Sequence, residues 1–380
     1  MIHVLNIMGK LAVGGMEATV MSYYRHISNV NIKYDFLVSE GEKEFFEDEA
    51  LSLGARIFKR PLRSQRPFKN VVSLCKILRR YPEIKIIHIH GASPPSAVDL
   101  IVAAFFGIRI RIATSGTEFP FLPLSYRLFQ PLLRLFATHW MCRTVRAGQS
   151  LYGKSSASKY IIMPPARDLA PFRYNIMLRS NVRHRLGVEN KFLCVNVARL
   201  QEVKNQSFLI NSFAIAKKTH PNLILFIVGR DFYTDRKQYE QLVSLPETLG
   251  LSDSVIFLGQ RDDIPELLQA ADLFLLPSIY EGLPGAAIEA QAAGLPCVLS
   301  DRINPEVKLI DSVEFLAIDK GPEIWAHQIV RYSNFSRHDT LEDVRSAGYD
   351  IKTAAKWLEN FYASEYERKY QKSKRLFYGK

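Results

Sequence analysis

Short apolar runs alternate with amphipathic stretches along almost the whole chain. The apolar runs predict buried strands, and the stretches between them have the pattern of helices. In the first half the predicted strands are Ile2–Met8, Tyr34–Val38, Ile84–Ile89, Ile108–Thr114 and Tyr160–Met163. In the second half they are Phe192–Ala198, Leu223–Val228, Val255–Leu258, Leu273–Leu276 and Cys297–Leu299. This alternation predicts parallel sheets that helices cover on both faces.

The two halves predict two domains. A polar, Pro-bearing segment from Met163 to about Arg185 separates them and is predicted to be a linker. We expect an α/β fold in which two Rossmann-like domains, at residues 1–170 and 171–350, face each other across a cleft. Residues 351–380 are predicted to form a C-terminal helix and a basic tail. A length of 380 residues is ample for two domains of ordinary size.

The composition is that of a globular protein, with 47% hydrophobic and 23% charged residues. No apolar run approaches the roughly 18 residues that a membrane-spanning helix needs, and the N-terminus lacks the basic region of a signal peptide. Four widely spaced cysteines, without a CxxC or metal-binding pattern, are predicted to be core residues in a reducing compartment. The cysteines are Cys75, Cys142, Cys194 and Cys297. We therefore expect a cytoplasmic protein.

The net charge of +12 is unevenly distributed. Residues 51–200 carry 25 Lys and Arg against 5 Asp and Glu, which indicates that this part meets an anionic surface. The segment Phe119–Phe136 mixes aromatic residues with Arg127 and Arg134, and this mixture favours a membrane surface over nucleic acid. We expect peripheral association with the inner face of the cell membrane. A partly buried helix with a solvated basic face is the alternative.

Two glutamates, Glu281 and Glu289, flank the run EGLPGAAIE after the predicted strand Leu273–Leu276. Glu281 is expected in the loop at the carboxyl end of that strand, and Glu289 about one turn into the next helix. Open α/β sheets bind ligands at this edge, and the helix start at Gly285 and Ala286 suits a phosphate. The alternative is a solvated loop glutamate and an ordinary first-turn glutamate that the helix dipole favours.

Cations follow two other predicted strands of the second half. Arg199 ends one strand, and Lys204 lies where the next helix begins. Together they suit a diphosphate, because arginine chelates phosphate oxygens and lysine adds a point charge. Arg261 follows Val255–Leu258 and is expected at the same edge. Surface salt bridges, and a helix cap by Asp262 or Asp263, are the alternatives.

A glycine-containing turn follows the first predicted strand and opens a helix. Gly14 and Gly15 allow the backbone to come close to a ligand, although the turn matches neither GxGxxG nor a P-loop. An ordinary tight connection is the alternative.

His88 and His90 alternate near the end of another predicted strand and are expected on one face, directed toward the cleft. Ser115 and Glu118 follow the strand Ile108–Thr114 and are candidate acceptor-side residues, with Glu118 as a general base or an acceptor contact. A structural histidine is the alternative for the pair. No metal triad and no G-x-S-x-G motif occurs, so we expect no metal site.

Five blocks of the sequence, in this order, resemble glycosyltransferase family 4, and in particular its EpsF-like exopolysaccharide and capsule enzymes. The blocks are HVLNIMGKLAVGGMEATVM, IIHIHG, VARLQEVKN, VIFLGQRDDIPELLQAADLFLLPS and YEGLPGAAIEAQAAGLPCVLSD. The last block carries the Glu-x7-Glu signature of that family. The resemblance implies the two-domain GT-B fold, with the acceptor domain first, the nucleotide-sugar domain second and a C-terminal helix that crosses back to the first.

The resemblance also implies roles for the candidate residues. Arg199 and Lys204 would neutralise the departing diphosphate, Glu281 would contact the donor sugar, and Glu289 would hold the ribose. Gly14, Gly15, Arg261, Gly285 and Ala286 would bind the donor, whereas His90, Ser115 and Glu118 would face the acceptor. Two departures concern these roles. The stretch Ala113 to Glu118 lacks the histidine that relatives usually carry, and Val228 to Asp231 reads VGRD in place of VGDGP.

The expected activity is therefore that of a metal-independent, retaining hexosyltransferase without a cofactor. The donor would be a UDP- or GDP-sugar, and the acceptor a saccharide or lipid-linked saccharide in exopolysaccharide, capsule or lipopolysaccharide biosynthesis. One alternative is a nucleotide-sugar epimerase of similar two-lobed fold. The other is a non-catalytic assembly partner that binds nucleotide-sugar, which the missing histidine would suit. No nucleic-acid partner is expected.

Overall fold

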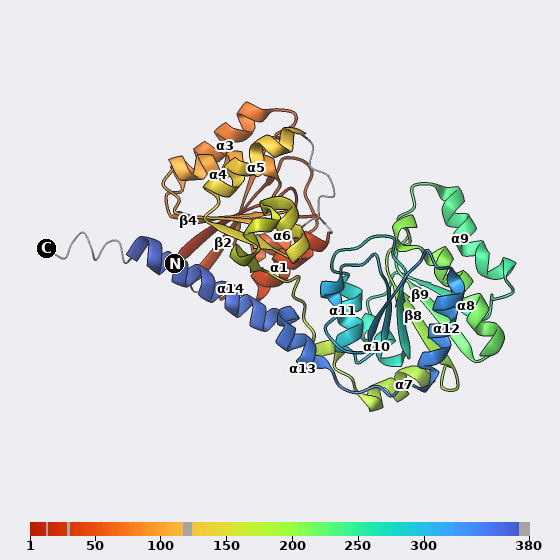
Figure 1. The fold of residues 1–380 in the computed structure, drawn as a ribbon. Coiled ribbons are helices and arrows are strands. Elements are labelled where there is room, and N and C mark those ends of the chain that lie inside the picture. Colours follow the sequence, from red (N-terminus) through yellow and green to blue (C-terminus); the bar gives the residue numbers. More distant parts are fainter. Residues whose placement is uncertain (13, 29–30, 117–123, 372–380) are drawn as a thin grey trace. The chain divides into compact units, whose positions relative to one another are not determined.

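The computed structural model describes residues 1–12, 14–28, 31–116 and 124–371. The chain forms two compact units, one of Met1–Arg167 with Asp350–Lys380 and the other of Asp168–Tyr349 (Figure 1). Each unit contains one fully parallel sheet with helices on both faces. The predicted fold class, an α/β chain with two Rossmann-like domains, is confirmed.

The first unit is built on a seven-stranded parallel sheet in the order β3-β2-β1-β4-β5-β6-β7. Its strands are β1 (Ile2–Ile7), β2 (Ile32–Ser39), β3 (Arg56–Arg60), β4 (Ile84–His90), β5 (Ile110–Ser115), β6 (His139–Cys142) and β7 (Tyr160–Ile162). Two of them, β3 and β6, were not predicted from the sequence. β3 is an edge strand with three basic residues out of five, and β6 has only four residues, so neither forms a clear apolar run.

Helices cover both faces of this sheet. They are α1 (Gly15–His26), α2 (Glu47–Ser52), α3 (Pro67–Arg80), α4 (Ala97–Phe105), α5 (Leu124–Phe136), α6 (Val145–Tyr152) and α14 (Ile351–Tyr366). Neighbouring strand residues point to opposite faces, so Val4 joins the core beneath α1 and α14, whereas Leu5 joins the core beneath α3, α4 and α5. Figure 1 shows α3, α4 and α5 side by side as one layer.

The C-terminal helix α14 is part of the first unit because its buried face is tied to the sheet. The hydroxyl of Tyr362 lies 2.6 Å from Nδ1 of His88, whose Nε2 lies 2.6 Å from the hydroxyl of Thr114. Tyr362 also packs edge-on against Tyr34. His88 therefore has a structural role, in agreement with the alternative left open for the histidine pair.

The second unit is built on a six-stranded parallel sheet in the order β10-β9-β8-β11-β12-β13. Its strands are β8 (Phe192–Val197), β9 (Leu223–Val228), β10 (Val255–Gly259), β11 (Leu273–Leu276), β12 (Cys297–Ser300) and β13 (Val313–Leu316). Five of the six agree with the predicted runs. β13 was missed because it is a short edge strand, only half-buried along most of its length, and contains Glu314.

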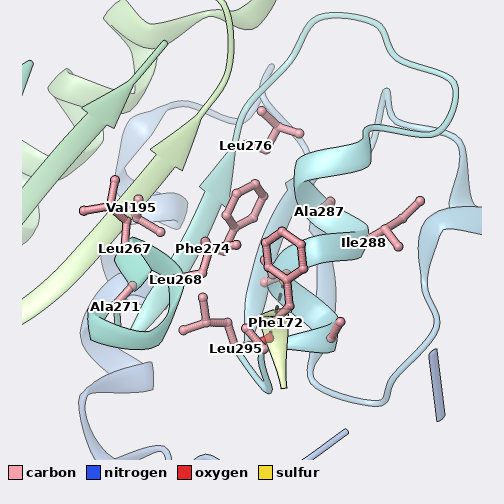
Figure 2. Close-up of a cluster of buried hydrophobic side chains, with 14 of the residues drawn as sticks. Phe172, Val195, Leu267, Leu268, Ala271, Phe274, Leu276, Ala287, Ile288 and Leu295 are labelled. Carbon is pink, nitrogen blue, oxygen red and sulfur yellow. Dashed lines mark hydrogen bonds between the residues drawn. The ribbon is translucent and has the colours of Figure 1, made fainter. Parts of the chain in front are cut away.

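Two buried clusters hold the helices of this unit to its sheet. The helices are α7 (Ile176–Leu186), α8 (Gln206–Thr219), α9 (Arg236–Thr248), α10 (Ile264–Ala270), α11 (Gly285–Ala292), α12 (Pro322–Arg331) and α13 (Leu341–Val344). Phe274 of β11 and Ile288 of α11 belong to the cluster drawn in Figure 2, which joins α10 and α11 to one face. Phe213 and Trp325 belong to the other cluster, beneath α8 and α12. Consequently, α8 and α11 cover opposite faces.

The predicted linker is wrong over its second half, because residues 176–186 form α7. The side chain of Asn175 caps this helix by accepting from the N–H groups of Met177 and Leu178. Arg183 bonds to the carboxylate of Asp272 at 2.9 Å and to nearby carbonyl groups. Polar residues thus anchor α7, so it lacks the apolar periodicity by which a helix is recognised in a sequence.

The cysteines lie where the sequence predicts them. Cys142, Cys194 and Cys297 are buried and Cys75 is half-buried, each as a thiol outside any disulfide. Burial raises the pKa of the thiols of Cys194 and Cys297, so both stay protonated at neutral pH.

Candidate functional site

The strand order of the second unit reverses between β8 and β11. The chain leaves β8 for α8 on one face and leaves β11 for α11 on the other, which makes this the topological switch point of the sheet. Open α/β sheets bind ligands in the crevice outside the carboxyl ends of such strands. The cations Arg199 and Lys204 follow β8, and the glutamate Glu281 follows β11. The structure thus brings the two predicted groups of residues to one place.

Lys204 and Glu281 form an ion pair at this point. Nζ of Lys204 lies 2.6 Å from Oε1 of Glu281, and the side chains are only 12% and 14% exposed. The hydroxyl of Ser278 donates to the same carboxylate oxygen at 2.7 Å. The loops themselves are joined, since the N–H of Ile279 donates to the carbonyl of Val203 at 2.8 Å. The sequence placed these residues on one edge, and the structure makes them direct partners.

Arg199 is exposed and lies against an aromatic ring. Its guanidinium carbon is 5.0 Å from the ring centre of Phe232, and that of Arg230 is 5.7 Å from the same centre. Leu200 and Phe232 hold the two loops together through a backbone hydrogen bond of 2.9 Å. Arg230 is thereby fixed beside Arg199. The sequence had marked it only as a departure from the VGDGP pattern, although a cation directly after a strand end was a usable signal.

A glycine keeps these loops close. A Cβ atom at Gly229 would come within 1.8 Å of the carbonyl oxygen of Ala198, which directly precedes Arg199. Only glycine allows this approach, so Gly229 determines where Arg199 and Arg230 stand relative to each other.

Helix α11 begins at the same edge, at Gly285. Its N-cap is Pro284, whose ring offers no hydrogen-bonding group to the first N–H groups of the helix. Gly285 and Ala286 are half-buried at this start, and Glu289 is half-buried one turn further on. The start of α11 therefore has the features of an anion site, next to the loop that carries Glu281.

Arg261 lies apart from this group. It follows β10, which β9 separates from β8, so strand spacing places it about 10 Å from the end of β8. Its guanidinium forms two hydrogen bonds of 2.8 and 2.6 Å with the carboxylate of Asp263. Its predicted donor contact stays a prediction, and its observed contact is the salt bridge that the sequence offered as the alternative.

In the first unit, Gly14 is the N-cap of α1 and Gly15 its first residue. The structure adds Arg143, from the end of β6, to this turn. Arg143 is half-buried, with Nη2 3.5 Å from the carbonyl oxygen of Met16. Burial lowers the pKa of Arg143 to about 10, and the side chain stays charged at neutral pH. Arg143 could not be predicted from the sequence, because only the folded sheet brings it to the turn.

Three residues, His90, Ser115 and Glu118, were predicted to face the acceptor. His90 is buried, and its Nε2 lies 2.9 Å from Oδ1 of Asn6. Burial lowers the pKa of His90 to about 3, so it is neutral at pH 7. Ser115 is fully buried and donates its hydroxyl to the carbonyl of Ala147 at 3.0 Å, which favours a structural role. Glu118 lies outside the described residues.

Among the described residues, no group of three or more His, Cys, Asp or Glu side chains is arranged to hold a metal ion. The charged groups described at the β8–β11 switch point are three cations, Arg199, Arg230 and Lys204, together with the carboxylate of Glu281. The arrangement is suited to a ligand with concentrated negative charge and neighbouring hydroxyl groups.

The chain is similar to known glycosyltransferases along its length. Residues 179–341 match the family described as glycosyl transferases group 1. The putative glycosyltransferase EpsF of Bacillus subtilis is 28% identical over 95% of this chain and 96% of its own length. The capsular polysaccharide biosynthesis glycosyltransferase CapH of Staphylococcus aureus is 24% identical over 96% of this chain and 99% of its own.

A third relative and a solved structure extend the comparison. The UDP-Gal:alpha-D-GlcNAc-diphosphoundecaprenol alpha-1,3-galactosyltransferase of Escherichia coli is 24% identical over 76% of each chain. The crystal structure of Anabaena HepE in complex with UDP superimposes with a TM-score of 0.77 at 19% identity, over 96% of this chain and all of that one. Residues 179–341 thus form a glycosyltransferase group 1 domain, and the chain that carries it is a glycosyltransferase with the two Rossmann-like domains of the GT-B fold.

Proposed function

We propose that the chain transfers a hexose from a nucleoside-diphosphate sugar to a saccharide or lipid-linked saccharide acceptor, with retention of anomeric configuration. We propose a UDP-sugar ahead of a GDP-sugar, since the Escherichia coli relative is named for UDP-Gal and HepE was solved with UDP. The relatives named for capsule and diphosphoundecaprenol substrates support a role in exopolysaccharide, capsule or lipopolysaccharide biosynthesis.

One observation carries the proposal. Cations that follow β8 meet a carboxylate and a helix start that follow β11, at the switch point of the second sheet. A nucleoside-diphosphate sugar needs both kinds of group, because its diphosphate is anionic and its sugar and ribose carry hydroxyls. In this proposal Arg199, Arg230 and Lys204 bind the diphosphate, while Glu281 and Glu289 accept hydrogen bonds from the sugar and the ribose.

The same groups supply the catalysis. As the bond between the anomeric carbon and the diphosphate breaks, negative charge grows on the leaving oxygen, and preorganised cations stabilise that charge. The acceptor hydroxyl attacks the same face of the sugar, and its proton passes to an oxygen of the departing diphosphate. Because three cationic side chains neutralise the leaving group, we propose that transfer needs no metal ion.

The test combines ligand binding with product analysis. Thermal unfolding of the full chain would be followed with UDP, GDP and ADP, since a ligand that binds the native state raises Tm. We expect UDP to give the largest rise, with Lys204→Ala reducing it and Lys191→Ala leaving it unchanged. Lys191 is an exposed lysine at the opposite end of β8, which makes it a matched control.

Incubation with UDP-hexoses and an acceptor panel then identifies the reaction. Transfer that persists with a chelator and yields the α-linked product from an α-linked donor supports the proposal. A new UDP-hexose formed without acceptor would identify an epimerase. Nucleotide binding with neither transfer nor hydrolysis would identify the non-catalytic partner.

We also propose peripheral membrane association through the layer of α3, α4 and α5. Its exposed apolar side chains include Phe68, Phe105, Leu128 and Leu135. Its exposed cations include Lys69, Arg79, Arg80, Arg127 and Arg134. The described residues of these helices include a single acidic side chain, Asp99, and it is buried. Apolar and cationic groups without exposed carboxylates suit an anionic bilayer.

This layer would rest on the bilayer surface. Within the ranges that the structure describes, no helix is long and apolar enough to cross a membrane. Cytoplasmic location at the inner face of the membrane, as expected from the sequence, remains part of the proposal.

A further inference from the structure

The first unit contains a pocket of about 440 Å³ at the carboxyl ends of β1 to β4. This β1–β4 pocket is lined in part by Ser39, Arg60, Arg63, His90, Asp99 and Tyr126. It lies where the order of the first sheet reverses, between β1 and β4, which is the position at which open α/β sheets bind ligands. His90, which was predicted to face the acceptor, lies at the edge of this pocket.

A buried carboxylate organises the floor of the pocket. Asp99 is only 2% exposed, and its two oxygens accept from Nη1 and Nη2 of Arg60 at 2.9 Å each. Arg63 donates to the same carboxylate. Burial alone would raise the pKa of Asp99, but the hydrogen bonds and charges of the two arginines lower it. The carboxylate is therefore ionised and holds two guanidinium groups in fixed positions.

The charges of the pocket do not balance. Arg60 and Arg63 contribute two positive charges and Asp99 one negative charge, while His90 is neutral at pH 7. Arg63 also donates to two uncharged groups, the carbonyl of Pro95 at 2.6 Å and Oδ1 of Asn70 at 3.2 Å. The pocket thus carries a surplus positive charge.

Arg63 presents that charge to a ligand. Its side chain is 27% exposed against 10% for Arg60, so Arg63 is the more accessible of the two guanidinium groups. Each Nη of a guanidinium carries two hydrogens, so each Nη of Arg63 retains one N–H donor beside its bond to Pro95 or Asp99. A fork held in place in this way is suited to a carboxylate or a phosphate.

The remaining lining suits a sugar ring. Ser39 and Ser93 add hydroxyl groups, which both donate and accept, and Tyr126 adds an aromatic side chain from α5. The hydroxyls of a saccharide can bond to the two serines, and its C–H groups can pack against the tyrosine ring. We propose that the β1–β4 pocket binds an anionic saccharide unit of the acceptor, with Arg63 paired to its carboxylate or phosphate.

The assignment to the acceptor rests on the proposed function, but binding to the pocket can be measured without it. The full chain would be titrated calorimetrically with cellobiouronic acid, with its neutral counterpart cellobiose, and with glucose 6-phosphate. We expect the charged sugars to bind and cellobiose to bind at least about tenfold more weakly, because only the charged ligands compensate Arg63. The preferred charged ligand distinguishes a uronic acid from a sugar phosphate.

Variants locate the contact. Arg63→Gln is expected to weaken the charged ligand about tenfold to a hundredfold. Arg63→Lys, which keeps the charge and loses the fork, is expected to have an intermediate effect. Arg66→Gln removes the same charge from an exposed side chain outside the pocket lining and should leave binding unchanged. UDP binding and Tm, measured on each variant, report whether the fold is intact.

Three results would overturn the inference. The first is equal affinity for cellobiose and cellobiouronic acid, and the second is an equal loss of affinity for the charged ligand in Arg63→Gln and Arg66→Gln. The third is no binding of either charged sugar at millimolar concentration. If Arg63→Gln fails to fold, two measurements still test the inference. They are the comparison of the ligands on the unaltered chain and the affinity of the Arg63→Lys variant. Failure of the proposed function would instead appear as absent nucleotide binding, with saccharide binding in the pocket unaffected.

Discussion

The ammonium nitrogen of Lys204 lies 2.6 Å from Oε1 of Glu281, so the cation after β8 is paired with the carboxylate after β11. The carboxylate of Glu281 compensates the charge of Lys204 within the protein. A diphosphate carries more negative charge than one carboxylate and would compete with Glu281 for this lysine. Its arrival would also release an oxygen of Glu281 to accept from a sugar hydroxyl. If both residues bind the donor as proposed, the ion pair must open when the donor binds.

Removal of Lys204 is expected to impair transfer strongly. Lys204→Ala should lower kcat/KM by about 10²–10³-fold, because a preorganised donor to the developing diphosphate charge is lost. Steady-state release of nucleoside diphosphate measures this. Lys191→Ala, at the opposite end of β8, should retain full activity. Equal rates for the two variants would exclude Lys204 from the leaving-group site.

Stability and activity, measured on the same variants, separate the ion pair from the catalytic roles proposed for its two members. Lys204→Met and Glu281→Gln should each destabilise the fold, while the double variant should be more stable than additivity predicts, with a coupling of roughly 0.5–3 kcal/mol. Activity should not recover in the double variant, since both donor contacts are then missing. Denaturant unfolding and transfer assays on the same four proteins measure both quantities.

The ring of Phe232 is expected to position two cations for the donor. Phe232→Ala should weaken binding of the preferred nucleotide about tenfold, because cation–π contacts of roughly 0.5–1 kcal/mol each hold Arg199 and Arg230. Phe232→Tyr keeps the aromatic face and should bind like the unaltered chain. Calorimetric titration distinguishes them, and equal weakening in both variants would contradict a positioning role for the ring.

Much of the fold could be predicted because the central strands are buried on both faces and therefore read as continuous apolar runs. β8 and β11 are such strands, and their carboxyl ends fix the edge at which Arg199 and Glu281 lie. The edge strands β3 and β13 escaped prediction because one side of each has no neighbouring strand, so polar residues are tolerated there.

The site could be predicted only where its residues directly follow a strand within a recognisable motif. Arg143 approaches the α1 turn from β6, more than a hundred residues away in the chain, and no periodicity specifies that approach. Arg230 lies beside Arg199 because of the ring of Phe232 and the absence of a side chain at Gly229. Such contacts depend on loop conformation, which the alternation of apolar and polar residues does not determine.

Buried histidines are expected to make the fold sensitive to acid. The pKa values of His88 and His90 lie below the ordinary value, chiefly because burial disfavours the charged form. Below about pH 6.5 the unfolded chain binds more protons than the native one, so the free energy of unfolding should fall as pH decreases. The slope is at most about 1.4 kcal/mol per pH unit for each histidine.

The measurement is denaturant unfolding between pH 7 and 4. His90→Gln should make the decline shallower, whereas His26→Gln, at an exposed histidine of the same unit, should leave it unchanged. An identical pH profile for all three proteins would show that His90 does not contribute to acid sensitivity.

The anchor of α7 is expected to matter for stability more than for catalysis. Asp272 accepts from Arg179, from Arg183 and, at 2.7 Å, from the N–H of Leu193, so one carboxylate ties α7 to the start of β8. Asp272→Asn should lower the free energy of unfolding by about 1.5–3 kcal/mol. Below Tm, kcat should stay unchanged, because these contacts lie at the opposite end of β8 from Lys204. A loss of kcat at full folding would contradict this separation.

The layer of α3, α4 and α5 is expected to bind anionic vesicles. Co-sedimentation with phosphatidylglycerol vesicles should be strong at low salt and weaken at high salt, because screening reduces the attraction of its exposed cations. Neutral phosphatidylcholine vesicles should capture little protein. Binding to both vesicle types alike, or no binding at low salt, would contradict the proposed surface.

Substitutions distinguish binding through this layer from non-specific electrostatic binding of a basic protein to the vesicles. Leu128→Glu and Phe105→Glu each place a carboxylate where an exposed apolar side chain stands, and each should reduce vesicle binding about tenfold, from lost apolar burial and added repulsion. Met177→Glu changes an equally exposed apolar residue of α7, in the other unit, and should bind like the unaltered chain. Transfer to a water-soluble acceptor should be unaffected in all three, because none of the three residues belongs to the proposed donor site.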